Sequence, residues 1–546
     1  MILKHFLSIS IVIVTLFSQS INAQSLKIEL VKDIDTNFYK NGVYPYIPMT
    51  SYNGKLYFAG TNKTNNYELW VSDGTESGTH IVKDIVQGAI GSYPKSFVIY
   101  KDLLYFGITN QSNEKELWRS DGTEAGTNLV KQIPITSLKT MKVFKNKLWI
   151  TSYFLNEYGD LIVSDGTEKG TKLFTGSDTI NPLVTNARIL AVTDSIMYLI
   201  GNITSSGFGT ELIRTDGTEE GTKVINDLIE GPNGSENNPF GFLLTDKDIY
   251  YIAYSEKLNP PTKTGVQLWK SNGTAEGSKV IKNLNVNYLP VYDYSFSNYE
   301  NNVYFNTYNE TLGFSGGVFN LWRTDGTEQG TIKFEKDSGN ISLGFVSYNN
   351  NMYYLNGAMH HEIWKTDGIN KKFIYKTGFF DEKQAYIKSY IIDNKLYYLY
   401  TDNSLKTNYS DFIEISGDSA KSLVADIPNF LHINDIEKVG NTLFMKILTS
   451  DKGVELYKMT FTTDVKDIRE LHQMSIFPNP STDEFEFNAK DQGDLIIYNS
   501  SGQQVLSKKC NEIGNIKVST KLTSGIYFVN FTTKNEIYQS KLIIQK

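Results

Sequence analysis

One segment recurs along the middle of this chain. It reads ELWVSDGTESGTHIVKDI from Glu68 and returns in altered form from Glu116, Asp160, Glu211, Gln267, Asn320 and Glu362. The position held by its Trp recurs at 70, 118, 162, 213, 269, 322 and 364, with Ile at 162 and 213. The spacing therefore runs from 42 to 56 residues. Two worn copies follow near Asp411 and Glu455. Repeats of this length are typical of propellers and solenoids, which limits the folds open to the chain.

A second marker has the same period. An apolar-aromatic stretch, Leu56-Tyr57-Phe58 in the first unit, precedes each copy and follows a turn signal such as Asn53-Gly54. Each unit therefore predicts four short strands, with the sequence DGTxxGT between the third and the fourth. We expect an all-β fold, a β-propeller of about 7–9 four-stranded blades. A solenoid or two smaller propellers is the alternative.

The start of the repeat region predicts how the ring closes. Leu30-Val31-Lys32-Asp33-Ile34 matches the fourth strand of the first unit, Ile81-Val82-Lys83-Asp84-Ile85, but no ELW segment precedes it. We expect this strand to complete the last blade, whose own ending is worn.

The repeat also gives a structural role to the Asp, Gly and Thr of the DGTxxGT loop, of which the Asp could otherwise be taken for a catalytic or metal-binding residue. Asp can bond to amides of its own turn, Gly can adopt a positive φ, and Thr can cap the returning strand. The loop resembles the Asp-box hairpin of sialidase propellers, where it is structural. A residue that recurs around a ring is a poor candidate for a unique catalyst, and no stretch has calcium-loop spacing. We assign to the framework Trp70, Asp73, Gly74, Trp118, Asp121, Gly122, Asp165, Asp216, Trp269, Trp322, Asp325, Trp364 and Asp367.

Arginine is too scarce for sialidase chemistry, which needs three guanidinium groups around a carboxylate. Arg119, Arg214 and Arg323 share one repeat position, which leaves only Arg188 and Arg469. We expect the three repeated arginines to pair with acidic residues of the adjacent blade.

The two ends of the chain predict export. Lys4, an apolar stretch and Asn22-Ala23 form a secretory signal peptide over 1–23, so the propeller would occupy 24–465. After a linker at 466–473, residues 474–546 read as short alternating strands of a small Ig-like β-sandwich.

The motifs FPNPS, YNSSGQQV, LTSGIYFV and KLIIQK closely resemble the type A C-terminal sorting domain of the type IX secretion system of Bacteroidetes. The repeat units likewise resemble the ELWxxDGTxxGT proteins secreted by these bacteria, for which no agreed activity is implied. The resemblance implies the secretion machinery as a partner and a secreted or outer-surface location. The residues that carry the sorting motifs include Pro478, Asn479, Pro480, Gly525, Tyr527, Lys541 and Lys546.

Composition excludes several kinds of chemistry. The net charge is −7 with no basic face for nucleic acid, and the one cysteine, Cys510, excludes a disulfide framework. His360-His361-Glu362 is the only histidine cluster, and neighbours on a strand point oppositely, so it chelates poorly. We expect no metal, no cofactor and no transmembrane segment in the mature chain.

The remaining variation lies in long loops, such as 202–209, 254–265 and 307–318. Three loop tyrosines are candidates for binding, namely Tyr288, Tyr292 and Tyr294. These loops favour a binding or adhesion module for a glycan or a surface protein. A glycoside hydrolase or lyase with a channel carboxylate is the enzymatic alternative, and a purely structural surface component is the third.

Overall fold

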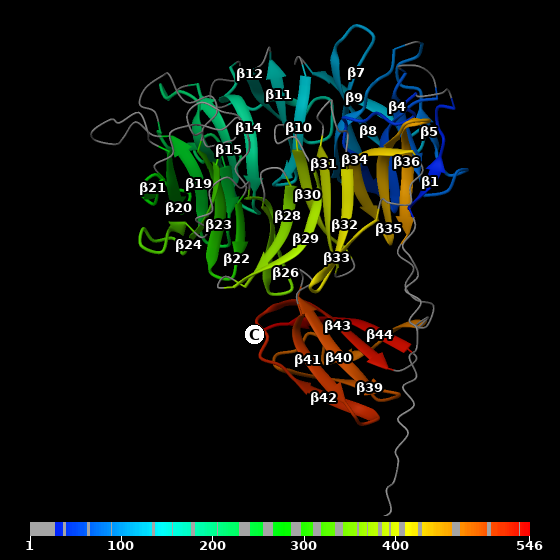
Figure 1. Ribbon diagram of the computed structural model, residues 1–546, viewed down its shortest axis with the longest axis vertical. Helices are drawn as coiled ribbons and strands as arrows, with labels where there is room; N and C mark the ends of the chain where they lie inside the picture. The colour runs from blue at the N-terminus through cyan, green and yellow to red at the C-terminus, as the bar shows by residue number, and fades with distance from the viewer. Residues whose placement is uncertain are drawn as a thin grey trace, which may run out of the picture. The chain divides into compact units, whose positions relative to one another are not determined.

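The structure is a computed structural model. It describes residues 28–36, 40–62, 66–88, 90–133, 137–154, 157–175, 181–204, 206–228, 241–254, 266–284, 296–309, 318–333, 342–356, 360–367, 370–379, 385–392, 395–402, 410–423, 429–460, 470–499, 504–533 and 536–546. The chain forms two compact units, Met1–Thr460 and Phe461–Lys546. Within the described ranges the regular structure is strand throughout, as the sequence predicts (Figure 1).

The first unit is built from four-stranded antiparallel sheets that follow one another along the chain. The first three blades contain β2 (Thr50–Tyr52), β3 (Lys55–Gly60), β4 (Glu68–Ser72) and β5 (His80–Lys83); β6 (Lys95–Tyr100), β7 (Leu103–Thr109), β8 (Lys115–Ser120) and β9 (Asn128–Ile133); and β10 (Ser137–Phe144), β11 (Lys147–Phe154), β12 (Glu157–Ser164) and β13 (Lys172–Leu173).

The next three blades contain β14 (Val184–Val192), β15 (Met197–Ile203), β16 (Glu211–Thr215) and β17 (Lys223–Asn226); β18 (Gly241–Leu244), β19 (Ile249–Tyr254), β20 (Val266–Ser271) and β21 (Lys279–Asn283); and β22 (Phe296–Tyr299), β23 (Asn302–Asn309), β24 (Val318–Thr324) and β25 (Ile332–Lys333).

The last three blades contain β26 (Ser342–Tyr348), β27 (Asn351–Asn356), β28 (His360–Thr366) and β29 (Lys371–Phe379); β30 (Ala385–Ile392), β31 (Lys395–Asp402), β32 (Ser410–Ser416) and β33 (Ser419–Ser422); and β34 (Phe430–Val439), β35 (Thr442–Thr449) and β36 (Gly453–Thr460), with β1 (Ile28–Lys32) as the fourth strand. The described residues thus form nine blades, the upper end of the expected number.

First strands of neighbouring blades contact one another, as β6 contacts β10 and β22 contacts β26, so these strands line the centre of the ring. The Leu and Trp of each ELW segment point to opposite faces of the blade, and both faces are covered by neighbouring blades. At the first junction, for example, Tyr57 and Leu69 pack with Leu104 and Phe106 of the second blade.

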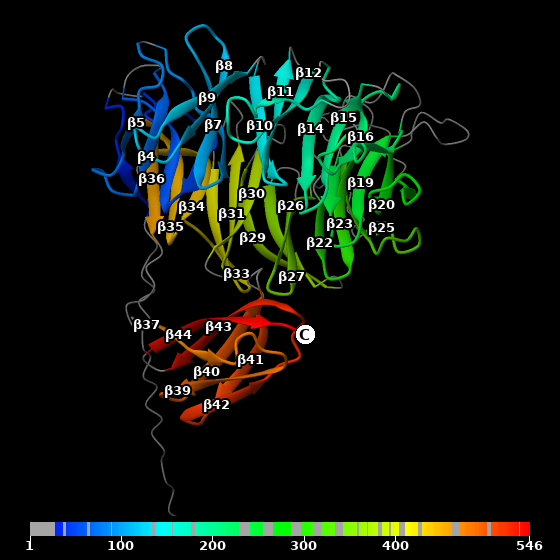
Figure 2. The same cartoon turned by 180° about the vertical axis from the view of Figure 1, so that it is seen from behind.

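The ring closes by pairing the first and last strands of the propeller, as predicted. Strand β1 pairs antiparallel with β36, with Ile28 opposite Met459 (Figure 1). Figure 2 shows β36 next to β4 and β5 of the first blade. The buried Glu455 carboxylate accepts hydrogen bonds from the backbone N–H groups of Ile34 and Gly42, both at 2.9 Å. Leu56 and Trp70 of the first blade pack in one cluster with residues of β1 and of the ninth blade, so closure buries a continuous core.

The second unit is a β-sandwich. One sheet has the order β38 (Ile476–Phe477), β39 (Glu484–Ala489) and β42 (Gly514–Ser519). The other has the order β37 (Glu470–Gln473), β44 (Glu536–Ile544), β43 (Gly525–Thr533), β40 (Gly493–Asn499) and β41 (Gln504–Cys510). Strand β37 lies inside the segment 466–473 that we expected as a linker, and it pairs in parallel with β44. Cys510 is buried in the sandwich core.

Candidate functional site

The DGTxxGT loops are closed by hydrogen bonds of their own. In the first blade the Asp73 carboxylate accepts from the Thr75 amide at 2.9 Å and from the Thr75 hydroxyl at 2.7 Å. These bonds hold the pKa of the Asp73 carboxyl below its usual value. The Ser72 and Thr79 hydroxyls, 2.7 Å apart, join the two ends of the loop. The same carboxylate contacts recur at Asp121, Asp165, Asp216 and Asp325.

Two framework positions depart from this pattern. Asn272 replaces Asp in the fifth blade and accepts the same two hydrogen bonds from Thr274. Asp367 accepts instead from the amide of Asn370 at 2.7 Å. Its sequence has Ile369 where the other loops have the Thr whose hydroxyl donates to the carboxylate. Among the described residues, no group of three or more His, Cys, Asp or Glu side chains is placed to hold a metal ion.

The same loops are also the contact points between blades. Lys83 at the end of β5 donates to the carbonyl of Thr127 at 2.8 Å, in the loop of the second blade. Lys32, Lys131 and Lys282 make the matching contact with Thr79, Thr171 and Thr331. Gly122 has φ +95° and lies against the hydroxyl of Tyr57 in the blade before it; Gly74, at φ +89°, lies similarly against Phe444. The glycine of the DGT loop is therefore needed at both positions, for its backbone conformation and for its lack of a side chain.

For two of the three repeated arginines, the expected acidic partners need correction. Arg119 donates to the carbonyl of Gly166 and Arg214 to the carbonyl of Gly273, each in the loop of the following blade. These bonds go to backbone oxygens and not to acidic side chains, because the glycine carbonyl is the part of the neighbouring loop that faces the arginine. The lysine in the same position of the seventh blade, Lys365, does pair with an acid of the next blade, Asp418.

The repeated tryptophans supply no open platform. Trp70, Trp269 and Trp322 are each at most 5% exposed. Trp118 and Trp364 are partly buried, and each donates its indole N–H to the glutamate two residues earlier.

Two carboxylates on an inner strand bear on the enzymatic alternative. Asp435 and Glu437 lie two residues apart on β34, outside the repeated positions. Asp435 accepts from the Met49 amide at 2.8 Å and Glu437 from the Ser51 amide at 3.0 Å, so both hold β2 against the ninth blade. Burial raises the pKa of Glu437, which is consistent with a structural carboxyl beside a second acid. This engagement with the backbone disfavours them as an acid–base pair.

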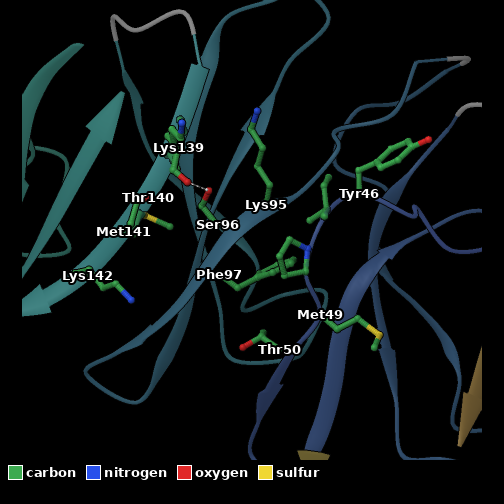
Figure 3. Close-up of a pocket in the computed structure, with 13 residues that line it drawn as sticks. Tyr46, Met49, Thr50, Lys95, Ser96, Phe97, Lys139, Thr140, Met141 and Lys142 are labelled. Atoms are coloured by element: carbon green, nitrogen blue, oxygen red, sulfur yellow. Dashed lines mark hydrogen bonds between the residues drawn. The ribbon is translucent and has the colours of Figure 1, made fainter. Parts of the chain in front are cut away.

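A pocket of about 500 Å³ lies where the inner strands of the first three blades begin (Figure 3). It is lined by Tyr46, Ile47, Pro48, Met49, Thr50, Lys95, Ser96, Phe97, Leu138, Lys139, Thr140, Met141 and Lys142. Three of these described lining residues are lysines and none is acidic. The pocket is therefore locally cationic in a chain whose net charge is −7.

The wall of this pocket is irregular. The pairing of β6 with β7 shifts register between Lys95 and Val98, and that of β10 with β11 shifts between Leu138 and Thr140. Ser96 has φ +57°, and its hydroxyl donates to the Lys139 carbonyl at 2.9 Å. A register shift with a left-handed residue recurs on β14, where Asn186 has φ +53° inside the shift between Thr185 and Arg188, so this irregularity also belongs to the framework of the inner strands.

The sequence did not single out these pocket residues, and none of the described lining residues belongs to the loops that it favoured. Tyr288, Tyr292 and Tyr294 lie outside the described residues, as do 255–265 and 310–317. A signal was nevertheless present: Lys95, Lys139 and Arg188 stand ten residues before the aromatic positions Tyr105, Trp149 and Tyr198. A cation thus recurs on the inner strands of three successive blades.

The sorting motifs meet in the second unit. The Asn479 side chain donates to the Lys541 carbonyl at 2.6 Å and accepts from the Ile543 amide at 2.8 Å. It thus ties the segment Pro478–Pro480 to β44. Tyr527 is buried, and its hydroxyl donates to the Thr523 carbonyl, two residues before Gly525. The terminal Lys546 pairs with Asp483 at 2.6 Å.

Residues 475–545 match a family described as the secretion system C-terminal sorting domain. No curated protein matches the chain. Similar solved structures include a computationally designed protein (TM-score 0.37, 10% identity, 68% of this chain and 96% of that one). They also include a puromycin-hydrolysing peptidase of Mycobacterium tuberculosis (TM-score 0.37, 9% identity, 73% and 59%). A third is the β-propeller domain of the Trilobed protease of Pyrococcus furiosus (TM-score 0.33, 12% identity, 59% and 92%). No helix in the described part of the chain has the length and apolar character needed to cross a bilayer.

Proposed function

We propose that this chain is a binding or adhesion module, displayed on or released from the cell surface by the type IX secretion system. In this proposal residues 1–23 are a signal peptide, 24–465 the binding propeller and 474–546 the sorting domain. The proposal is supported by the resemblance of the repeat units to the ELWxxDGT proteins secreted by Bacteroidetes. The sorting-domain match at 475–545 supports export.

The pocket at the start of β2, β6 and β10 carries the binding proposal. Its volume of about 500 Å³ falls within the usual range for ligand sites, about 300–1,000 Å³. Its polar groups come from three different blades, so the rigid ring fixes their relative positions. The framework residues, by contrast, are occupied in bonds within and between blades. Binding is therefore the function that the described residues support best.

The carbohydrate-active alternative has weaker support. It needs two carboxyl groups facing a common space, and the pair on β34 is bonded to the backbone of β2. A purely structural role does not account for a pocket whose described lining has three lysines and no acid.

A glycan array incubated with the full chain tests the proposal. We expect retention of a defined group of sugars by the parent chain and its loss in Lys142→Glu, because Lys142 is an exposed residue of the pocket. Lys169→Glu is the matched control, since Lys169 is exposed on the same blade but outside the pocket lining. Equal retention by the parent and Lys142→Glu would contradict this site. Loss of the printed sugar from the array would establish the enzyme instead. If the chain retains no glycan, glycans are excluded as the ligand and a protein ligand is favoured.

A further inference from the structure

We infer that the secretion machinery recognises the outward face of the larger sheet of the second unit, through an apolar stripe on β40, β43 and β44. The apolar stripe consists of Tyr498, Ile526, Phe528 and Ile543, with Lys541 beside it. The partner that fits is a protein surface that is apolar and carries an acidic group opposite Lys541. This inference rests on the proposed export function and specifies which residues of the sorting domain the machinery contacts.

Two of these side chains lie exposed in the middle of a sheet. Strand β43 lies between β44 and β40 in the five-stranded sheet (Figure 1). Tyr527, Val529 and Phe531 belong to the buried core of the sandwich, so the residues between them point outward. Ile526 and Phe528, on this outward side, are 44% and 49% exposed. They add little to the core, so folding alone does not explain why these positions hold large apolar side chains.

The strand register joins the outward side chains into one group. Phe528 is directly opposite Tyr498 of β40 on one side and Lys541 of β44 on the other. Ile526 is directly opposite Ile543 of β44. Opposite residues of an antiparallel pair have their Cβ atoms about 4.5–5.5 Å apart on the same face of the sheet. The apolar stripe is therefore contiguous, unlike the single exposed apolar residues that are normal on protein surfaces.

The smaller sheet shows that the sandwich does not need an apolar outer face. On β39 the buried Phe485 and Phe487 alternate with the exposed Glu484 and Glu486. Lys517 of β42 forms an ion pair with Glu484 on this polar face. Antiparallel sheets with one solvated face normally alternate in this way. The apolar outward residues of β43 are a local exception, and a partner that covers them would explain it.

The sorting motifs indicate that this partner is the secretion machinery. Residues 475–545 match the secretion system C-terminal sorting domain. The apolar stripe and Lys541 come from three motifs of that domain, YNSSGQQV, LTSGIYFV and KLIIQK. Folding explains the buried motif residues, such as Tyr527 and Leu542. The exposed motif residues Ile526, Phe528 and Lys541 are not explained by folding, and they lie together on one face.

Export of the full chain by a bacterium that has the type IX system tests the inference. The exported fraction is the amount of chain on the surface and in the medium, divided by the total amount made. Double substitution of Ile526→Thr and Phe528→Thr should lower this fraction about tenfold, because apolar contact is lost while β propensity is kept. Ile513→Thr is the matched control and should be exported like the parent, since Ile513 is 66% exposed in the same unit but lies outside β40, β43 and β44.

Charge variants test the acidic group of the partner. Lys541→Glu should lower the exported fraction about tenfold through like-charge repulsion, whereas Lys541→Arg should retain export. The purified double variant and Lys541→Glu should unfold at the urea concentration of the parent, because the three substituted side chains are exposed. A lower urea midpoint in the double variant would make the apolar stripe part of the fold and overturn the inference. Equal export of Lys541→Glu and the parent would contradict the acidic group.

Three other outcomes would contradict the apolar stripe. Export of the double variant at the parent's level would overturn the inference while leaving the export function intact. Loss of export in Phe477→Thr but not in the double variant would place recognition on β38, where Phe477 is 72% exposed. A double variant that loses self-association and not export would assign the stripe to a second copy of this chain. Undiminished export of a chain without residues 474–546 would instead contradict the proposed export function itself.

Discussion

At the scale of single residues, the glycine of the DGT loop has two roles that can be separated. Gly54 in the first hairpin has φ +70° and, among the described residues, no heavy atom near the position of a Cβ. Gly122 has φ +95°, and a Cβ there would collide with the buried Tyr57 hydroxyl of the preceding blade. Both sites need the left-handed conformation, but only Gly122 needs the space.

We therefore expect Gly54→Ala to lower the free energy of unfolding by about 1 kcal/mol, and Gly122→Ala by at least about 2 kcal/mol. Urea unfolding of the two variants measures the difference. Tyr57→Phe removes the colliding oxygen. The double variant of Tyr57→Phe and Gly122→Ala should therefore lose less free energy of unfolding than the sum of the losses of the two single variants. Equal losses at Gly54 and Gly122 would show that conformation alone sets the requirement for glycine.

At the scale of elements, blades are joined by fourth-strand lysines that bind the next loop. Lys83 donates to the Thr127 carbonyl at 2.8 Å and lies 5.9 Å from the ring centre of Trp118. We expect Lys83→Met to lower the free energy of unfolding by about 1–2 kcal/mol, because a charged donor is lost while the carbonyl stays. Lys169→Met, at an exposed loop position, is the control and should change it by less than about 0.5 kcal/mol. Indistinguishable thermal unfolding of the two variants would contradict a joining role for this lysine.

The elements also show what could be predicted from the sequence. Strands and blades repeat, so the match of Leu30–Ile34 to the fourth-strand pattern was enough to predict the pairing of β1 with β36. The bulge of β6 between Lys95 and Val98 has a counterpart on β14 between Thr185 and Arg188, but β10 shifts between Leu138 and Thr140, and a one-residue difference changes which side chains face the centre. Tyr46 also lies outside every repeated segment. The framework was therefore predictable and the site was not.

At the scale of the whole molecule, closure depends on a short strand at the start of the propeller. Removal of residues 1–32 would leave the edge of β36 unpaired and uncover the cluster that contains Leu56, Trp70 and Leu456. An exposed edge strand of this kind promotes association. We expect the truncated chain to form soluble aggregates in light scattering and to unfold at a lower temperature than the full chain. A monomeric truncated chain with unchanged unfolding would show that the ring does not need this strand.

Closure should also respond to pH through Glu455, the acid that binds the amides of Ile34 and Gly42. Burial raises the pKa of its carboxyl from 4.5 to about 8. Between these values the folded chain keeps a proton that the unfolded chain has lost, so stability falls as the pH rises from about 5 to 8. Over this pH range the free energy of unfolding should fall by about 3 kcal/mol. Glu455→Gln should remove this part of the slope.

The amide is a fair replacement because Gln267 holds the same position of the fifth blade and is 1% exposed. One amide oxygen cannot accept both backbone N–H groups in the same way, so we expect a further loss of about 1 kcal/mol that does not depend on pH. Urea unfolding of the parent and Glu455→Gln at intervals from pH 5 to 8 measures both terms. The exposed Glu76→Gln should leave the parent's slope unchanged. Parallel pH profiles for the parent and Glu455→Gln would mean that Glu455 does not gain its proton on folding, and that closure is held by strand pairing and packing alone.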